Sequence, residues 1–400
     1  MATQIRQTLA MTKANLSSLR RRFAISISMA LSVALVVAVL AGFLAMAAGF
    51  QRTLAGAGSP VVAVVLGGGS NQETGSDIPA DAIRTLLSMR GDIGVVRDAA
   101  GNGVASRELV VTVDAAQAQG GATTTLALRG MDVAGVSVRD GPRLLAGRLF
   151  TPGAREIVVG VRIADEFPGF GIGERIRLGA VEWLVVGRFG ADGGAFESEI
   201  WGDLNAVQAA FDRQGEVQSL RLRLTNAPSI ARLNVALATA AATPFKAVSE
   251  AELYAAQAAQ TSSLIRLFAW PVALLMAVGA TAGALNTMMS SVSDRAVEIA
   301  TVRALGFSRL SAFLATWIEA IVLAAAGASL GVAASWLIFN GWQASTVGAN
   351  NAKMAFQLLV GGDVMLLAGL LGLAIGVVGG ALPAFAAIRL PLTAALRNSG

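Results

Sequence analysis

The 400-residue chain contains no cysteine and no histidine. These absences exclude cysteine nucleophiles, catalytic triads that need an imidazole base, and metal sites built from thiolate or imidazole ligands. Lysine is also rare, occurring at Lys13, Lys246 and Lys353. None of the three stands in the Gly-x-x-x-x-Gly-Lys-[Ser/Thr] pattern of a phosphate-binding loop, so the chain does not bind ATP through such a loop.

Charged residues are scarce as well, at 14% of the chain, whereas soluble domains contain about 25%. Uncharged apolar runs cover residues 23–51, 267–293, 310–352 and 364–388, and Glu319 alone interrupts the third run. Because about 20 apolar residues suffice to cross a bilayer as a helix, the runs predict four transmembrane helices. The first run is roughly twice as long as the apolar core of a cleaved signal peptide, so we interpret it as a retained span.

The distribution of charge predicts the orientation of these spans. Before the first span there are five basic residues and no acidic residue, namely Arg6, Lys13, Arg20, Arg21 and Arg22. The positive-inside rule therefore places the N-terminus in the cytoplasm, and four spans return the C-terminus with Arg389 and Arg397 to the same side. Acidic residues slightly outnumber basic ones between residues 51 and 263. The net charge of +5 thus belongs to the membrane-flanking parts and does not indicate a nucleic-acid partner.

We therefore predict an α-helical membrane protein with four transmembrane helices and a mixed α/β extracytoplasmic domain inserted between the first and second spans. The predicted order along the chain is a cytoplasmic amphipathic helix (1–22), transmembrane helix 1 (23–51), a periplasmic two-lobed α/β domain (52–263), transmembrane helix 2 (264–292), a cytoplasmic coupling helix (293–309), transmembrane helix 3 (310–339), a periplasmic loop (340–363), transmembrane helix 4 (364–388) and a cytoplasmic tail (389–400).

Local patterns support this organisation. The first segment has an apolar stripe at spacings of three and four, which predicts a helix lying on the inner leaflet, a partly disordered basic tail being the alternative. This stripe consists of Ile5, Leu9, Thr12, Leu16 and Leu19. In the inserted domain, β-branched and alternating runs predict strands at 61–66, 108–113, 124–128, 156–159, 175–178, 181–186 and 217–224. Residues 249–266 favour a helix that continues towards the second span, where Pro271 is expected to kink it.

The charged segment 293–309 lies between two long apolar runs. Ser291 stands three residues before Asp294 and could cap a helix, Gly306 could end it, and Arg295 and Glu298 are spaced as a pair on one turn. A face that mixes charges with exposed apolar side chains suits a groove on a partner protein. The alternative is an interfacial helix that simply joins two spans.

Polar and small residues inside the spans suggest further roles. Glu319 lies about ten residues into the third span, where an ionised carboxylate is costly unless it is paired. It is interpreted either as a coupling or gating contact or as a hydrogen-bond partner of a neighbouring helix. Glycines four residues apart permit close helix packing or dimerisation. They are Gly279 and Gly283 in the second span, Gly327 and Gly331 in the third, and Gly372, Gly376 and Gly380 in the fourth.

Several of these segments resemble a known family. They are Asp294-Arg-Ala-Val-Glu-Ile-Ala-Thr-Val-Arg-Ala-Leu-Gly-Phe-Ser-Arg309 with the following Glu319-Ala320 and Gly327-x-x-x-Gly331, the closing stretch Leu382-Pro-Ala-Phe-Ala-Ala-Ile-Arg-Leu-Pro-Leu-Thr-Ala-Ala-Leu-Arg397, and, in the inserted domain, Gly147-Arg-Leu-Phe150, Ile172-Gly-Glu-Arg-Ile176 and Val185-Val-Gly187. Together they resemble the FtsX-like permease of MacB-type ABC transporters, here without the fused ATPase domain.

The resemblance implies a non-catalytic permease subunit of the bacterial inner membrane. It implies a second permease copy or a paralogue as dimer partner, and a separate cytoplasmic ABC ATPase that binds ATP and Mg while this chain binds no cofactor or metal. A periplasmic adaptor, an outer-membrane duct and membrane lipids are further implied partners. The residues that would carry ATPase coupling are Arg295, Glu298, Val302, Arg303, Leu305 and Gly306.

The implied function is export or mechanotransmission across the envelope, driven by ATP hydrolysis in the partner. The alternative within the same family is a membrane-anchored assembly or signalling factor that acts on envelope proteins or lipoproteins. An ion-driven transporter would need several intramembrane charges, and Glu319 is the single one within the four apolar runs. The sequence leaves the cargo and the choice between homodimer and heterodimer open.

Overall fold

The computed structural model describes residues 2–19, 23–88, 93–116, 123–240, 245–348 and 352–389. The chain divides into two compact units. The helical unit comprises Met1–Ala48, Ser263–Trp342 and Leu358–Gly400, and the sheet unit comprises Gly49–Ser262 and Gln343–Gln357. The basic residues Arg20, Arg21, Arg22 and Arg397 and most of the predicted tail 389–400 lie outside the described ranges.

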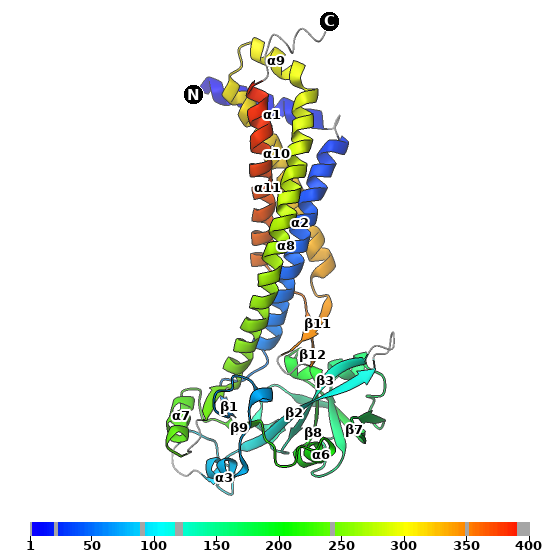
Figure 1. Cartoon of the computed structure of the whole chain (residues 1–400), viewed down its shortest axis with the longest axis vertical. Coiled ribbons are helices and arrows are strands. Elements are labelled where there is room, and N and C mark those ends of the chain that lie inside the picture. The colour runs from blue at the N-terminus through cyan, green and yellow to red at the C-terminus, as the bar shows by residue number, and fades with distance from the viewer. Residues whose placement is uncertain are drawn as a thin grey trace. The chain divides into compact units, whose positions relative to one another are not determined.

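The helical unit is built from helices α1 (Ala2–Ser18), α2 (Phe23–Ala55), α8 (Glu250–Asp294), α9 (Ala296–Ala304), α10 (Arg309–Phe339) and α11 (Gly362–Arg389). By length and composition, α2, α8, α10 and α11 are each able to cross a membrane, and they contain the four predicted spans. They lie side by side, with α1 and α9 at the same end of the bundle (Figure 1). Helix α8 continues through Pro271.

Small side chains fill the core of this bundle. Helix α2 contributes larger residues such as Val33 and Leu40, whereas α8 and α10 contribute mainly alanines such as Ala277 and Ala324. A bilayer offers apolar side chains no hydrophobic gain from leaving lipid, so helices associate through close packing of small residues. The alanine-rich faces therefore permit close approach of the four helices.

The sheet unit is mixed α/β, as predicted. Its strands are β1 (Val62–Leu66), β2 (Ala105–Ala116), β3 (Thr123–Met131), β4 (Arg143–Gly147), β5 (Glu156–Gly160), β6 (Arg175–Leu178), β7 (Val181–Gly190), β8 (Glu199–Asp203), β9 (Ser219–Arg223) and β10 (Lys246–Ser249). Within the described ranges they form one sheet in the order β10-β1-β9-β2-β3-β8-β5-β7-β4, with β6 paired to β7. Pairing is parallel between β3 and β8 and between β5 and β7, and antiparallel elsewhere.

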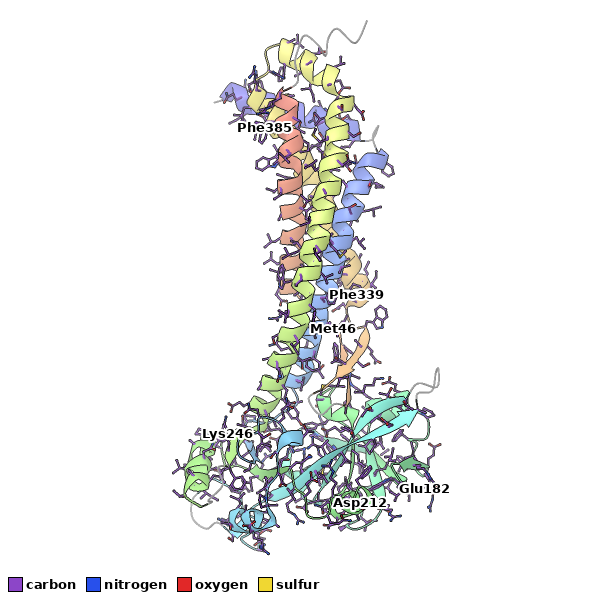
Figure 2. The ribbon with its side chains drawn as sticks, viewed as in Figure 1. Met46, Glu182, Asp212, Lys246, Phe339 and Phe385 are labelled. Carbon is purple, nitrogen blue, oxygen red and sulfur yellow. The ribbon has the colours of Figure 1, made fainter. Side chains whose placement is uncertain are left out.

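Short helices connect and cover the strands. They are η2 (Glu73–Gly75), α3 (Ala80–Ser88), α4 (Gly135–Val138), α5 (Val161–Glu166), η3 (Ala195–Ser198), α6 (Leu204–Ala210) and α7 (Ser229–Ala240). Asn234 of α7 covers the edge strand β10: its side-chain amide donates to the carbonyl of Ala247 at 2.8 Å and its oxygen accepts from the Ala247 N–H at 2.9 Å. Charged side chains such as Glu182, Asp212 and Lys246 project from the surface of the unit (Figure 2).

The range 340–363, predicted as a loop, contains a β-hairpin. Strands β11 (Gln343–Val347) and β12 (Lys353–Gln357) pair in antiparallel register and belong to the sheet unit. The Lys353 ammonium pairs with Glu166 of α5 and lies 5.2 Å from the centre of the Phe167 ring. The sequence did not reveal this hairpin because β11 consists mainly of small and polar residues and the apolar stretch of β12, Met354-Ala-Phe356, is only three residues long.

Seven charged side chains are buried together inside the sheet unit: Glu73, Glu108, Arg129, Arg139, Glu199, Arg221 and Glu250. Arg129 on β3 donates to Glu199 on β8 at 2.9 and 2.7 Å and to Glu108 on β2 at 3.0 Å. Arg221 on β9 donates through Nε to Oε1 of Glu250, the first residue of α8, at 3.0 Å. A buried charge is costly unless it is paired. The cluster therefore fixes how the central strands meet one another and the first turn of α8.

Candidate functional site

The segment between α8 and α10 is the candidate site. Ser291 lies inside α8, which runs to Asp294, so the prediction that Ser291 caps a new helix is wrong: the preceding apolar helix continues past the proposed start. Helix α9 begins after Arg295, whose side chain makes no capping bond. Gly306 adopts a positive φ of 98° just after the helix, a conformation that suits glycine, and the predicted helix end is confirmed.

Helix α10 then begins with a side-chain cap. The Oγ of Ser308 accepts a hydrogen bond from the N–H of Ser311 at 3.1 Å, as expected of serine at an N-cap. The segment is therefore a short helix held between two defined helix ends.

The six residues assigned to ATPase coupling differ in exposure. The Glu298 side chain is 71% exposed, Leu305 is 77% exposed, and Gly306 is also exposed. Val302 and Arg303 are half-buried, and Val302 packs against the buried cluster of Met11, Ala312 and Ala315. Arg295 is turned inward. The exposed positions 297, 298, 301 and 304 of α9 and the following position 305 recur at spacings of three and four, so they form one face.

Arg295 joins three helices. Its side chain is 11% exposed, and its Nη1 donates to Oε2 of Glu319 on α10 at 3.1 Å. Its Nη2 donates to the side-chain oxygen of Asn15 on α1, and its Nε donates to Glu298 at 3.3 Å. The structure thus brings Arg295, Glu298 and Glu319 together and adds Asn15, which sequence reasoning missed. No local pattern in the sequence could have identified Asn15, because its partner lies 280 residues away.

Glu319 is buried on α10, with 1% of its surface exposed. A carboxylate in this position requires a paired charge. The guanidinium of Arg295 supplies that charge from the start of the candidate segment.

Helix α1 also contacts the other end of the segment. The side-chain amide of Gln7 donates to the carbonyl of Gly306 at 3.5 Å, and its oxygen accepts from the N–H of Ser308 at 3.3 Å. The Ser311 hydroxyl donates to the carbonyl of Gln4 at 3.4 Å. The apolar stripe of α1 lies on a different face, where Ile5 and Leu9 are exposed.

The glycine motifs of α10 and α11 are used inside the bundle. A Cβ at Gly327 or Gly331 would lie 2.4 or 2.5 Å from a backbone carbonyl oxygen of α2. A Cβ at Gly372, Gly376 or Gly380 would lie 2.7, 2.3 or 2.4 Å from the nearest side-chain carbon of α2 or α10. These five positions therefore require glycine for close helix packing.

The motif of α8 is different. Among the described residues, a Cβ at Gly279 or Gly283 would meet no neighbouring atom within 4 Å. The adjacent side chains of Leu275 and Val278 are exposed. This face of α8 is therefore uncovered within the part of the chain that the structure describes.

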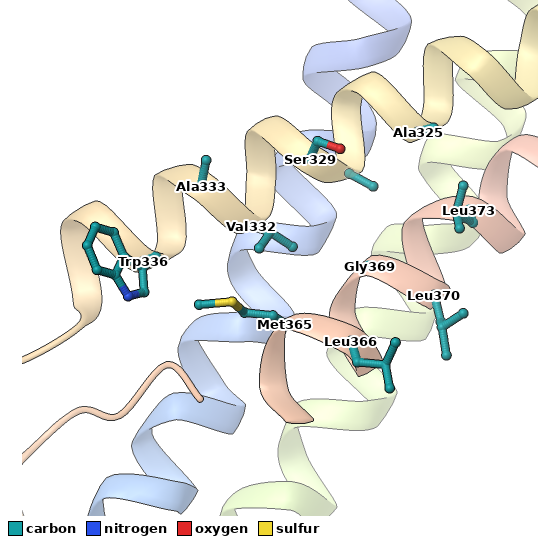
Figure 3. A pocket seen from close by; sticks show the side chains of 11 residues that line it. Ala325, Ser329, Val332, Ala333, Trp336, Met365, Leu366, Gly369, Leu370 and Leu373 are labelled. Atoms are coloured by element: carbon teal, nitrogen blue, oxygen red, sulfur yellow. The ribbon is translucent and has the colours of Figure 1, made fainter. Parts of the chain in front are cut away.

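An apolar hollow of about 520 Å³ lies between α10 and α11 (Figure 3). Val332 and Trp336 line it from α10, and Met365 and Leu370 line it from α11. Its lining includes no charged side chain, so it offers no acid, base or metal ligand. Elsewhere in the described ranges, no group of three or more carboxylates is placed to hold a metal ion.

Comparisons with known proteins cover both units. The family model of the MacB-like periplasmic core domain matches residues 24–251, and that of the FtsX-like permease C-terminal domain matches residues 271–392. The sequence matches none of the curated proteins with which it was compared.

Two solved structures show weaker similarity. The extracellular domain of the noncanonic ABC-type transporter YknZ from Gram-positive bacteria is 15% identical, with a TM-score of 0.36 over 47% of this chain and 100% of that chain. The periplasmic region of MacB from Actinobacillus actinomycetemcomitans is 11% identical, with a TM-score of 0.37 over 51% of this chain and 95% of that chain. The periplasmic core model alone matches more than half of the sequence and the permease model matches most of the remainder, so the chain belongs to the MacB/FtsX-type family of ABC transporter permeases.

Proposed function

We propose that this chain is the transmembrane permease subunit of a MacB-type transporter and that a separate cytoplasmic ABC ATPase docks on the exposed face of α9. The observation that carries the proposal is the pairing of an exposed carboxylate, Glu298, with an exposed apolar side chain, Leu305, on one short helix whose opposite side is packed. An apolar anchor beside a charge suits a groove on a partner protein.

In this proposal the chain itself catalyses nothing. ATP and Mg bind to the partner ATPase, and the chain converts the movement of that partner into displacement of its periplasmic domain for export or mechanotransmission. The chain lies in the bacterial inner membrane, with both termini and α9 in the cytoplasm and residues 52–263 in the periplasm. A periplasmic adaptor would contact the moving periplasmic domain, and an outer-membrane duct would carry any cargo onward.

The functional unit is a dimer of permeases. The uncovered face of α8 around Gly279 and Gly283 supports a contact with a second copy or a paralogue, because the remaining glycine motifs are used within the chain. Small residues four apart permit such a contact between helices in lipid.

The docking proposal is tested by co-expressing the chain with an ABC ATPase of the same cell and measuring affinity in detergent. We expect Glu298→Arg and Leu305→Asp each to weaken binding about tenfold or more, because a central interface contact is worth about 1.4 kcal/mol or more. Val235→Asp on α7 alters another exposed apolar residue and is the matched control, expected to leave affinity unchanged. Unchanged affinity and unchanged ATPase stimulation in both docking variants would contradict the proposal.

A further inference from the structure

One face of α1 contacts both ends of the coupling segment. Gln4, Gln7, Met11 and Asn15 lie within about 80° of arc at 100° per residue, so they form a single face of the helix. Asn15 accepts from Arg295 before α9 begins, and Gln7 contacts Gly306 and Ser308 after α9 ends.

Between these two contacts, Met11 is buried against Ala312 and Ala315 of α10, with Val302 of α9 and Phe307 packed at the edge. The face of α1 that contacts protein is therefore mainly polar. The apolar stripe with Ile5 and Leu9 remains available for the membrane interface.

The chemistry of arginine suits the position of Arg295. A guanidinium presents five N–H donors in a planar fork, and here three of its nitrogens bind acceptors on three different elements. A lysine ammonium at the same place would be a point charge on a flexible stem and could not reproduce this fork. Loss of the positive charge would also remove the guanidinium that faces the buried carboxylate of Glu319, which is unfavourable for a buried ion pair.

We propose that Arg295 is a positioning residue and that it forms, with Glu319 and α1, a splint that holds the coupling segment at a fixed orientation to α10. Arg295 does not itself contact the partner ATPase. It prevents α9 from rotating relative to α10. A displacement of α9 by the partner therefore moves α10 as well. This inference rests on the proposed docking of an ATPase to α9, but its structural part is testable without any partner.

The first experiment uses the full chain in membranes, without an ATPase. Because the chain has no cysteine, Gln7→Cys and Ser308→Cys create a single pair that a short bismaleimide can join. We expect Arg295→Gln to lower the cross-linking yield about threefold or more, since the buried charge network is broken. Arg309→Gln changes an exposed arginine of the same segment and is expected to leave the yield unchanged.

The second experiment measures the partner ATPase with the permease reconstituted. Arg295→Gln is expected to leave the dissociation constant within about twofold of the parent value and to reduce stimulated ATP turnover about fivefold. Glu319→Gln should produce the same defect, and the double variant should be no worse than either single one, because both residues act as one pair. Arg295→Lys keeps the charge and should give an intermediate turnover.

The outcomes separate this inference from the proposed function. Loss of ATPase binding in Arg295→Gln, equal to that of Leu305→Asp, would make Arg295 a docking residue and overturn the inference. An unchanged cross-linking yield in Arg295→Gln would also overturn it. If Leu305→Asp leaves ATPase binding intact while Arg295→Gln still lowers the cross-linking yield, the docking proposal fails and the splint stands.

Discussion

At the scale of single residues, the sheet unit depends on charges that are buried together. Glu108 is fully buried, which by itself raises the pKa of its carboxyl group, but the charges of Arg139, Arg221 and Arg129 outweigh burial and lower that pKa to about 2. The pKa of Glu73 is likewise lowered well below its ordinary value, burial again being outweighed by Arg129 and Arg221. Both groups therefore stay ionised in the folded domain under conditions that protonate an unfolded carboxylate.

The low pKa of Glu108 predicts an acid-dependent loss of stability. Because the folded-state pKa is below the unfolded value of 4.5, the stabilisation is present above pH 4.5 and is lost as the pH falls towards about 2. Glu108→Gln leaves three guanidinium groups short of a negative charge, so we expect about 3 to 5 kcal/mol of destabilisation at neutral pH. The melting temperature of the full chain in detergent, followed by tryptophan fluorescence from pH 7 to pH 2, should be lower in the variant and less dependent on pH below 4.5.

A conservative change at the surface provides the comparison for this experiment. Glu182→Gln also removes one carboxylate from the sheet unit but at an exposed position, so its melting curve should follow that of the parent chain. Parallel pH profiles for Glu108→Gln and the parent chain between pH 4.5 and 2 would show that the buried cluster does not set the acid stability.

At the scale of elements, glycine-to-leucine substitution is expected to destabilise the chain at a motif packed inside the bundle and to have no effect at the uncovered motif of α8. At Gly376 even a Cβ would lie 2.3 Å from the Cβ of Ala324, so overpacking in Gly376→Leu should destabilise the chain by about 1 to 3 kcal/mol or more. A Cβ at Gly279 would meet no neighbouring atom within 4 Å among the described residues, so Gly279→Leu should leave the melting temperature of the isolated chain unchanged. If α8 forms the dimer contact, Gly279→Leu should weaken the dimer, as measured by light scattering in detergent. A fully dimeric Gly279→Leu chain would move the contact to another helix.

The helices were more predictable from the sequence than the strands. Long uncharged runs identify the spans because lipid permits little else. Strands with buried β-branched runs, such as β1 and β5, were also recognised. Strands β4, β8 and β10 were not recognised. Strand β4 is exposed along its whole length, β8 contains the buried acids Glu199 and Asp203, and β10 has only Ala247 and Val248 between two polar residues. Acidic residues interrupt the apolar pattern by which a buried strand is recognised from the sequence. In β8 the partner of Glu199 is on another strand, so the local sequence does not indicate that this acid is buried.

The candidate site shows the same division between local and distant information. Charge and glycine placement predicted the segment and its end at Gly306, and the family resemblance grouped Arg295 with Leu305 among the residues that would carry ATPase coupling. The structure separates these two, because Leu305 projects outward while Arg295 points to Glu319 and Asn15. Which side of α9 faces inward is decided by α1 and α10, and a helical wheel of α9 alone contains no information about either.

At the scale of the whole molecule, every proposed role depends on which side of the membrane α9 lies and on which side the sheet unit lies. The basic excess before the first span predicts that α1 is cytoplasmic, and two crossings by the first two apolar runs would return the chain to the same side at α9. An ATPase reaches α9 only with this orientation.

A cysteine-free chain allows this orientation to be measured directly. Ser293→Cys lies at an exposed position just before α9, and Ser137→Cys lies at an exposed position of α4 in the sheet unit. In intact cells made permeable at the outer membrane, a charged maleimide that does not cross the inner membrane should label Ser137→Cys and not Ser293→Cys. Lysis should make both sites equally reactive, which controls for local reactivity. Labelling of Ser293→Cys from outside would place α9 beyond the reach of ATP, and the docking of an ATPase on Leu305 and Glu298 would then be impossible whatever the affinity measured in detergent.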